Sequence, residues 1–216
     1  MEFINLPRSR RLVSTPSLEW TDQFKVGYEK DLDATAVEIP YADNDISLIL
    51  LLPGKVSEFV VNGLDDIERK LDTKSWEQLL RTFVIRNLEM HVPLIKTHSV
   101  INMNETLISL GLKDSFSDEA DFSGINGAKD LKLSSFFQVN EFALEKFTSK
   151  RRKRNTSDKV LSFLRSQRQA ETYQLHFERQ FMYVVRHNPT GLLLFIGRYQ
   201  HPDESSDNHH HDLHDR

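Results

Sequence analysis

The sequence contains no cysteine, so disulfide bonds cannot hold the fold and no thiol chemistry is possible. This absence removes redox information without deciding the compartment. Long apolar runs are also missing. The longest candidate, Ile46–Leu52, contains Ser47 and stops at Pro53, far short of the ~20 residues that cross a bilayer. Residues 1–11 lack the apolar core of a signal peptide. The sequence therefore predicts no membrane partner and, taken as it stands, no export.

Signatures of catalysis are scarce as well. We find no glycine-rich phosphate loop, no cofactor motif and no candidate nucleophile with a nearby base. The C-terminus has residue types that bind metals, namely His209, His210, His211, Asp212, His214 and Asp215. A flexible terminal cluster binds metals weakly, because no neighbouring side chains orient its imidazoles. We therefore expect no enzyme activity, no cofactor and no resident metal.

What is present is typical of a folded domain. The 216 residues are 38% hydrophobic and 28% charged, which is enough for one domain with a sizeable core. The formal net charge of −4 conceals a local imbalance, because residues 146–168 contain nine Lys or Arg and one acid. This stretch is therefore at +8, and the rest of the chain is acidic, at −12.

Hydrophobic patterns predict many strands and a few short helices. Alternation is typical of half-buried strands at 24–28 and 84–92, and the apolar run 46–52 predicts a strand buried on both faces. Helical spacing marks 64–71, 75–83 and 105–110, and two apolar strands, 181–185 and 192–196, flank a turn that contains Pro189 and Gly191. The fold class is α+β. We expect a loosely ordered lead-in over 1–19, a domain over 20–202 and a mobile, acidic, histidine-rich tail over 203–216.

Four blocks of sequence, in a fixed order, carry a family resemblance. They are Val37–Tyr41 with Ile46–Pro53, then His91–Pro93, then Leu107–Gly111 with Ala120–Ile125, and last Phe181–Arg198 with Pro202. Together they resemble the C-terminal half of the serpin family of serine protease inhibitors, from about Phe24 to Pro202. The resemblance implies a serpin-like fold of mixed and antiparallel sheets, truncated so that the N-terminal helical half and part of the central sheet are absent. Members of the family are usually secreted, so the resemblance also implies an extracellular protein.

The resemblance implies a mechanism with two physical requirements. Serpins inhibit by a suicide reaction, in which a protease cuts a bait bond in an exposed loop, here expected over 146–180, and becomes an acyl-enzyme. The N-terminal arm of the loop then inserts as a new strand into the central sheet and deforms the enzyme. The sheet must therefore open, and every second side chain of the arm must be buried.

The inserting arm of this chain is charged where the family has small, mostly uncharged residues. Counted forward from Leu131, the resemblance places its hinge at Thr148, Ser149, Lys150, Arg151, Arg152, Lys153 and Arg154. Counted back from Phe181, the arm shifts a few residues later but still contains Arg151 to Arg154. About half of these cations would turn inward on insertion, and an unpaired buried charge costs on the order of several kcal/mol. We therefore expect that the chain does not trap proteases by loop insertion.

The bait bond is placed by counting back from Phe181. This count puts it near Arg165–Ser166, which would suit a trypsin-like serine protease, and Arg168 is a second candidate because the length of the loop leaves the register open. The alternative is an ordinary solvated arginine.

The run Lys150–Arg154 has three interpretations. It is a dibasic processing site, a patch for a heparin-like polyanion or nucleic acid, or a solvated loop without a partner. No aromatic residues interleave the run, so sequence-specific nucleic-acid recognition is not expected.

Three hypotheses about function follow. The first is a nominal serine protease inhibitor that engages a protease near Arg165 only as a substrate or a competitive binder. The second is a non-inhibitory binding module that holds an acidic partner with the basic loop. The third is a degenerate serpin remnant without activity.

Overall fold

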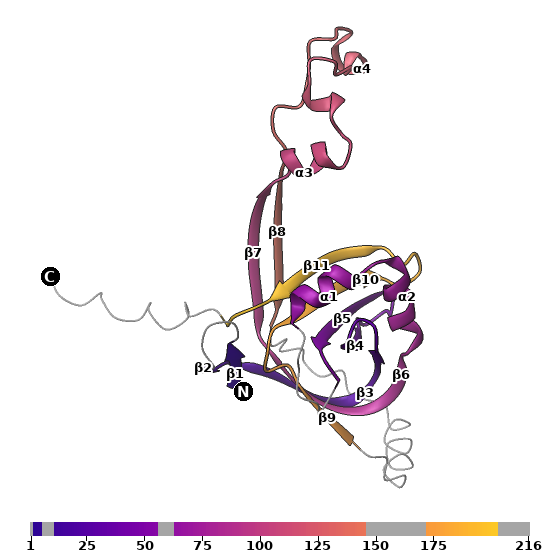
Figure 1. The fold of residues 1–216 in the computed structure, drawn as a ribbon, viewed down its shortest axis with the longest axis vertical. Coiled ribbons are helices and arrows are strands. Elements are labelled where there is room, and N and C mark those ends of the chain that lie inside the picture. Colours follow the sequence, from indigo (N-terminus) through magenta and orange to yellow (C-terminus); the bar gives the residue numbers. More distant parts are fainter. Residues whose placement is uncertain (1, 6–10, 56–62, 146–171, 203–216) are drawn as a thin grey trace, which may run out of the picture. The chain divides into compact units, whose positions relative to one another are not determined.

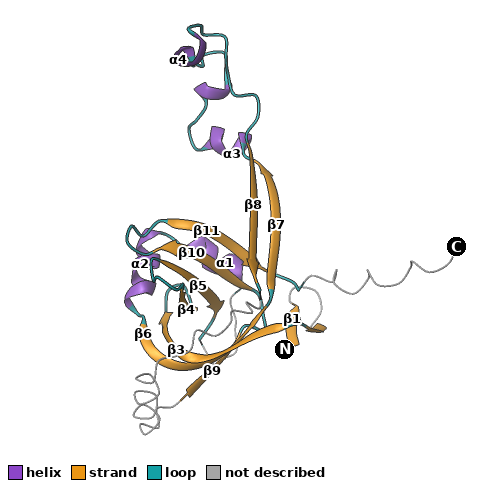
Figure 2. Ribbon diagram, turned by 180° about the vertical axis from the view of Figure 1, so that it is seen from behind, coloured by secondary structure: helices purple, strands orange, loops and turns teal. Residues whose placement is uncertain are grey.

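The computed structural model describes residues 2–5, 11–55, 63–145 and 172–202. The chain divides into two compact units, which we describe separately: one comprises Met1–Leu94 and Glu145–Arg216, and the other Ile95–Leu144. Figures 1 and 2 show strands as the dominant elements of the described residues. None of the helices in these residues is long and apolar enough to cross a membrane.

The first unit is built on a seven-stranded sheet. Its elements are β1 (Glu2–Asn5), β2 (Arg11–Ser14), β3 (Ser17–Glu29), β4 (Ala34–Pro40), β5 (Ile46–Pro53), α1 (Leu64–Lys70), α2 (Thr73–Arg81), β6 (Val84–Pro93), β9 (Thr172–His176), β10 (Phe181–His187) and β11 (Leu193–Tyr199). The strand order is β11-β10-β5-β4-β3-β6-β9, and β1 pairs with β2 in a sheet of their own. All neighbours are antiparallel except β6 and β9, which run parallel. The mixed sheet and the short helices confirm the α+β prediction.

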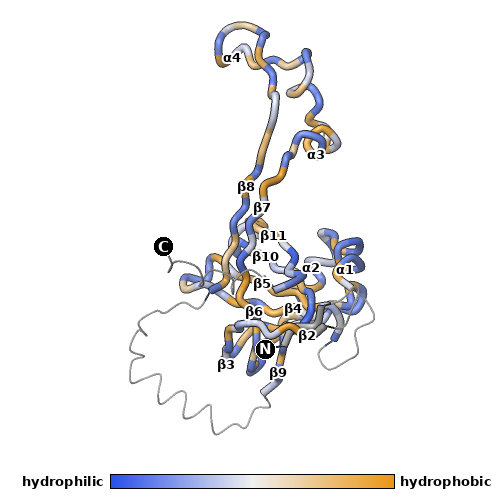
Figure 3. The backbone as a smooth tube through the Cα atoms, turned by 90° about the vertical axis from the view of Figure 1, so that its left-hand side faces the viewer, coloured by the Kyte–Doolittle hydropathy of each residue, from blue (hydrophilic) through white to orange (hydrophobic). Residues whose placement is uncertain are grey.

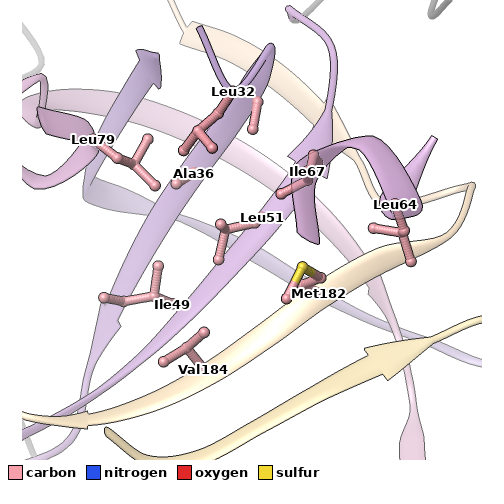
Figure 4. Packing of buried hydrophobic residues seen from close by; sticks show 10 residues of the cluster. Leu32, Ala36, Ile49, Leu51, Leu64, Ile67, Leu79, Met182 and Val184 are labelled. Atoms are coloured by element: carbon pink, nitrogen blue, oxygen red, sulfur yellow. The ribbon is translucent and has the colours of Figure 1, made fainter. Parts of the chain in front are cut away.

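The core of this unit lies where two helices cover the middle of the sheet. Apart from Ser47, β5 is apolar, and all but its first residue are buried, as the apolar run predicts. Leu64 and Ile67 project from α1 onto β4, β5 and β10 (Figure 4). The buried cluster comprises Leu32, Ala34, Ala36, Ile49, Leu51, Leu64, Ile67, Leu79, Met182 and Val184.

A capping box fixes the start of α2. The Asp72 side chain accepts a hydrogen bond from the backbone N–H of Ser75 at 2.7 Å, and the Ser75 hydroxyl oxygen accepts one from the N–H of Asp72 at 2.9 Å. The bond from the Ser75 backbone is the main reason that the pKa of Asp72 lies below its ordinary value. The helix therefore begins at a defined residue, which orients its apolar side toward the cluster.

Strand β3 joins the two halves of the sheet. Its C-terminal residues pair with β4, and its pairing with β6 extends from Ser17 to Val26. At Gly27 a Cβ would lie 3.0 Å from the carbonyl carbon of Thr82 and 2.8 Å from the Phe83 ring. Glycine is therefore needed here because the turn after α2 passes directly over the strand.

The second unit is a long two-stranded ribbon with a helical connection. It comprises β7 (Ile95–Asn102), α3 (Asn104–Ser109), the 3₁₀ turn η1 (Asp114–Phe116), α4 (Ser123–Asn126) and β8 (Phe137–Leu144). Strands β7 and β8 pair antiparallel over eight residues, and both hydrophobic and hydrophilic residues occur along them (Figure 3). Lys132 bonds Asp118 at 2.5 Å and Lys129 bonds Asp121 at 2.7 Å, which ties the connection to itself.

Most expected elements occur, with one difference at the N-terminus. The predicted helices 64–71, 75–83 and 105–110 appear as α1, α2 and α3. However, β3 begins at Ser17 and buries Leu18, so the end of the expected lead-in 1–19 belongs to the sheet. Residues 19–23 are mostly polar because this part of β3 is largely exposed, and the pattern therefore did not mark a strand. The tail 203–216 lies outside the described residues.

Candidate functional site

The expected protease-binding loop connects the two units. It leaves β8 after Leu144 and reaches β9 at Thr172. All the hinge residues, Thr148 to Arg154, and the bait-bond residues Arg165 and Ser166, with the second candidate Arg168, lie outside the residues that the structure describes. Their roles remain predictions. The structure does describe the two ends of the loop, and these determine what it can do.

The C-terminal end of the expected loop is part of the sheet. The prediction placed residues 146–180 in the loop, whereas Thr172–His176 form β9, which pairs with β6 from Asn87 to His91. The reason is apolar burial, since Leu175 is 3% exposed and Phe177 is fully buried. The loop must therefore end near residue 171.

Two stacked imidazoles mark the junction between β9 and β6. The rings of His91 and His176 lie parallel, with centroids 4.7 Å apart. His91 also lies 3.8 Å from a Glu19 oxygen and 3.6 Å from a Glu89 oxygen. The backbone N–H of Phe177 donates to the carbonyl oxygen of His91 at 2.9 Å. Side-chain and backbone contacts thus hold the same point of β9.

Aromatic packing continues this anchor into the core. The ring of Phe177 meets Phe181 edge to face at 5.1 Å, and Phe181 stacks on Tyr199 at 5.0 Å. Arg179, which lies between Phe177 and Phe181 in the sequence, is half-buried, and its Nη2 donates to the carbonyl oxygen of Pro53 at 2.7 Å. Burial lowers the pKa of Arg179, and the neighbouring charge of Glu178 acts in the opposite direction. The chain after the loop is therefore fixed to β5, β6 and β11 together.

The N-terminal end of the loop leaves an exposed strand. Among the described residues, β8 has β7 as its one partner, so its other edge has no neighbour within that part of the chain. Most side chains of β8 are exposed, including Phe137 and Val139, and Phe142 is buried. Insertion of an arm between two neighbouring strands requires a strand on each side, and the described residues supply one of them.

Sequence reasoning did not find the His91 and His176 pair. His91 was visible only as part of a block that resembles the family, and nothing in the sequence shows that a parallel pairing brings the distant His176 onto it. His187 is the last residue of β10, with its Nδ1 2.7 Å from the Thr190 hydroxyl oxygen. Within residues 2–5, 11–55, 63–145 and 172–202, no group of three or more His, Asp or Glu side chains could hold a metal ion. The cluster from His209 to Asp215 lies outside these residues.

Comparisons with known proteins identify the family. The family model described as Serpin (serine protease inhibitor) matches residues 5–202. Leukocyte elastase inhibitor of Bos taurus is 32% identical over 187 residues, which cover 83% of this chain and 47% of that protein. Serpin B3 of Homo sapiens is 29% identical over 178 residues, which cover 80% of this chain and 43% of that protein. The chain thus spans about half the length of the curated relatives it matches.

Solved structures agree on the fold. Uncleaved ovalbumin aligns with a TM-score of 0.73 at 20% identity, over 94% of this chain and 48% of that one. Native protease nexin-1, solved with heparin, aligns with a TM-score of 0.73 at 22% identity, over 94% and 51% of the two chains. The α+β arrangement of mixed and antiparallel strands is therefore a serpin-like arrangement. From the family match and the relatives together, this chain belongs to the serpin family.

Proposed function

We propose that this chain meets a trypsin-like serine protease as a substrate or reversible ligand, through a bait bond at Arg165–Ser166, and does not trap it covalently. Serpin relatives named as elastase inhibitors support a protease as the partner. The single observation that carries the proposal is the run of five consecutive cations, Lys150–Arg154, in the arm that would have to insert. In this proposal the chain contributes no catalytic group of its own.

The energetic argument depends on strand geometry. Successive side chains of a strand point to opposite faces, so two or three of the five cations in Lys150–Arg154 would face the interior in either register. Each would cost on the order of several kcal/mol if unpaired, for a total of roughly 10 kcal/mol. That total is comparable with the whole stability of a domain, about 5–15 kcal/mol. The acyl-enzyme would then be hydrolysed before the arm could insert.

The ends of the loop support the same conclusion. After the bait bond, β9 is held by buried Leu175 and Phe177, so the cut loop keeps its C-terminal anchor. Before it, β8 offers an edge with one described neighbour rather than a gap between two strands. An arm that adds to such an edge gains fewer contacts than one that is buried on both sides.

Trypsin and a denaturing gel test the proposal. We expect cleavage within the loop, with a cut near residue 165 that mass spectrometry locates, no adduct that survives denaturation, and active trypsin at the end. Arg165→Ala should remove this cut, whereas Arg168→Ala is the matched control and should leave it. A stable adduct of chain and trypsin would contradict the proposal.

A variant with Arg151, Arg152, Lys153 and Arg154 all changed to Ala tests the cause, because removal of the charges should favour adduct formation if a sheet can accept the arm.

A second candidate is a binding module for a heparin-like polyanion. The observation that favours it is the separation of charge, with +8 in residues 146–168 and −12 elsewhere. We expect salt-dependent retention on a heparin column and its loss when residues 151–154 are changed to Ala. Retention of that variant at the same salt concentration would rule this candidate out. We also propose that the protein is extracellular. The test is whether the protein expressed from the full-length transcript is secreted into the culture medium.

A further inference from the structure

A cavity of about 450 Å³ opens on the seven-stranded sheet where β3, β6 and β9 meet. Its lining residues come mainly from these three strands and include Val26, Val84, Arg86, Leu88, Tyr173 and Leu175. All of these residues belong to one compact unit. The volume is within the range of small-molecule sites, which is about 300–1,000 Å³.

Strand register explains why apolar side chains converge here. Val26 pairs with Val84 across β3 and β6, and Leu88 pairs with Tyr173 across β6 and β9. Directly paired residues share one face of a sheet, and alternate residues along a strand return to that face. Leu88 and Leu175, 2% and 3% exposed, form the floor. Val84 and Tyr173, 47% and 44% exposed, form the rim.

The polar part of the lining has one sign of charge. Lys55 and Arg86 are cationic, and the lining contains no aspartate or glutamate. Lys55 lies over the Tyr28 ring, 6.0 Å from its centroid. In the part of the chain that the structure describes, the Arg86 side chain forms no hydrogen bond or ion pair, and it lies on the same face as Val84 and Leu88. An arginine beside apolar walls suits a carboxylate, which can accept two parallel hydrogen bonds from the guanidinium.

We propose that this cavity binds an amphipathic organic anion, with an apolar body on Val26, Leu88 and Leu175 and a single carboxylate head on Arg86. A neutral apolar molecule would leave the Arg86 guanidinium without a partner, and a polyanion would place charge against the apolar floor. A monocarboxylate with an alkyl body satisfies both parts of the lining. The site is separate from the bait bond, so this inference does not depend on the proposed function. The ligand would nevertheless contact β9, the strand that receives the C-terminal end of the loop.

Fluorescence titration of the 216-residue chain with 11-(dansylamino)undecanoic acid tests this site, with dodecanoate and its methyl ester as competitors. We expect saturable binding at one site, displacement by dodecanoate and at least about tenfold weaker displacement by the ester, because a charge-assisted hydrogen bond contributes roughly that factor. Arg86→Ala should weaken binding of the probe about as much. Val84→Trp should block the mouth without changing the buried floor.

Two exposed positions serve as matched controls. Ile85→Ala removes an apolar side chain that is 64% exposed from the opposite face of the same strand, and Arg81→Ala removes an arginine at the end of α2. Neither should change the affinity, and circular dichroism melts confirm that each variant is folded. The proposal is overturned by a wild-type chain that shows no saturable binding, by an ester that competes as well as dodecanoate, or by an Ile85→Ala effect as large as that of Arg86→Ala.

Discussion

The anchor of β9 allows a quantitative test at Phe177. This side chain is fully buried and lies 5.1 Å from the Phe181 ring, at the point where the chain leaves β9. Phe177→Ala should lower the free energy of unfolding by about 3–5 kcal/mol, because it removes a large apolar surface and leaves a cavity. The backbone bond from residue 177 to His91 does not depend on the side chain, so the loss reports packing alone.

Urea unfolding followed by tryptophan fluorescence measures this change. Trp20 and Trp76, the two tryptophans of the sequence, both lie in the unit that contains Phe177. Tyr173→Ala is the matched control, because its side chain in β9 is 44% exposed, and should cost less than about 1 kcal/mol. Hydrogen exchange should accelerate in β9 of Phe177→Ala. The reasoning is refuted by a loss below about 1 kcal/mol at Phe177, or by an equal loss at Tyr173.

Three further predictions follow from single positions. Gly27→Ala should destabilise the chain by about 1–3 kcal/mol, because the Cβ would meet the Thr82 backbone, whereas Gly124→Ala, with nothing within 4 Å, should be neutral in the same urea assay. Asp72 accepts its cap bonds best when ionised, so its pKa in the folded state lies below its pKa in the unfolded state. Its contribution to the stability of the fold is therefore complete above the unfolded-state pKa and is lost as pH falls through the folded-state pKa. Asp72→Asn, which caps without titrating, should therefore be the less stable chain at about pH 6, and the difference should shrink below about pH 4; a constant difference would contradict this. The Nη2 atom of Arg198 lies 2.6 Å from an Asp65 oxygen, and its Nε lies 3.1 Å from a Glu68 oxygen without forming a hydrogen bond to it. Arg198→Ala should therefore lower the stability by less than about 1 kcal/mol, and by less still in high salt, as measured by thermal melts.

Periodicity was sufficient for the elements with a strong apolar pattern. The run Ile46–Leu52 and the spacing of Leu64 and Ile67 correctly predicted β5 and α1, because burial of an entire strand or one helix side requires those residues. The same reasoning did not detect the first half of β3, where polar residues are paired in the sheet but exposed to solvent. Backbone pairing, not side-chain burial, makes that segment a strand.

The site was less predictable because its contacts are distant in sequence. Residues 172–180 were assigned to the loop by counting from Phe181, yet the alternation of Leu175 and Phe177 was a sufficient signal for a strand. Its parallel pairing with β6 joins residues more than eighty positions apart, which no local pattern encodes. The cavity depends on that pairing, so Arg86 could not have been selected from the sequence.

The apolar strand β11 determines how the trypsin experiment must be interpreted. Its first four residues, Leu193–Ile196, are all apolar, but β11 lies at the edge of the sheet in the described residues, and these four residues are each at least 40% exposed. An exposed apolar edge favours self-association and partial unfolding. Trypsin can cut an unfolded chain at any of its 28 Lys and Arg residues, so fragmentation alone does not show that a loop is presented as a substrate. Cuts that are confined to the expected loop and include Arg165, in a chain that still melts cooperatively, do distinguish the two, because a folded sheet protects its cations while an exposed loop does not.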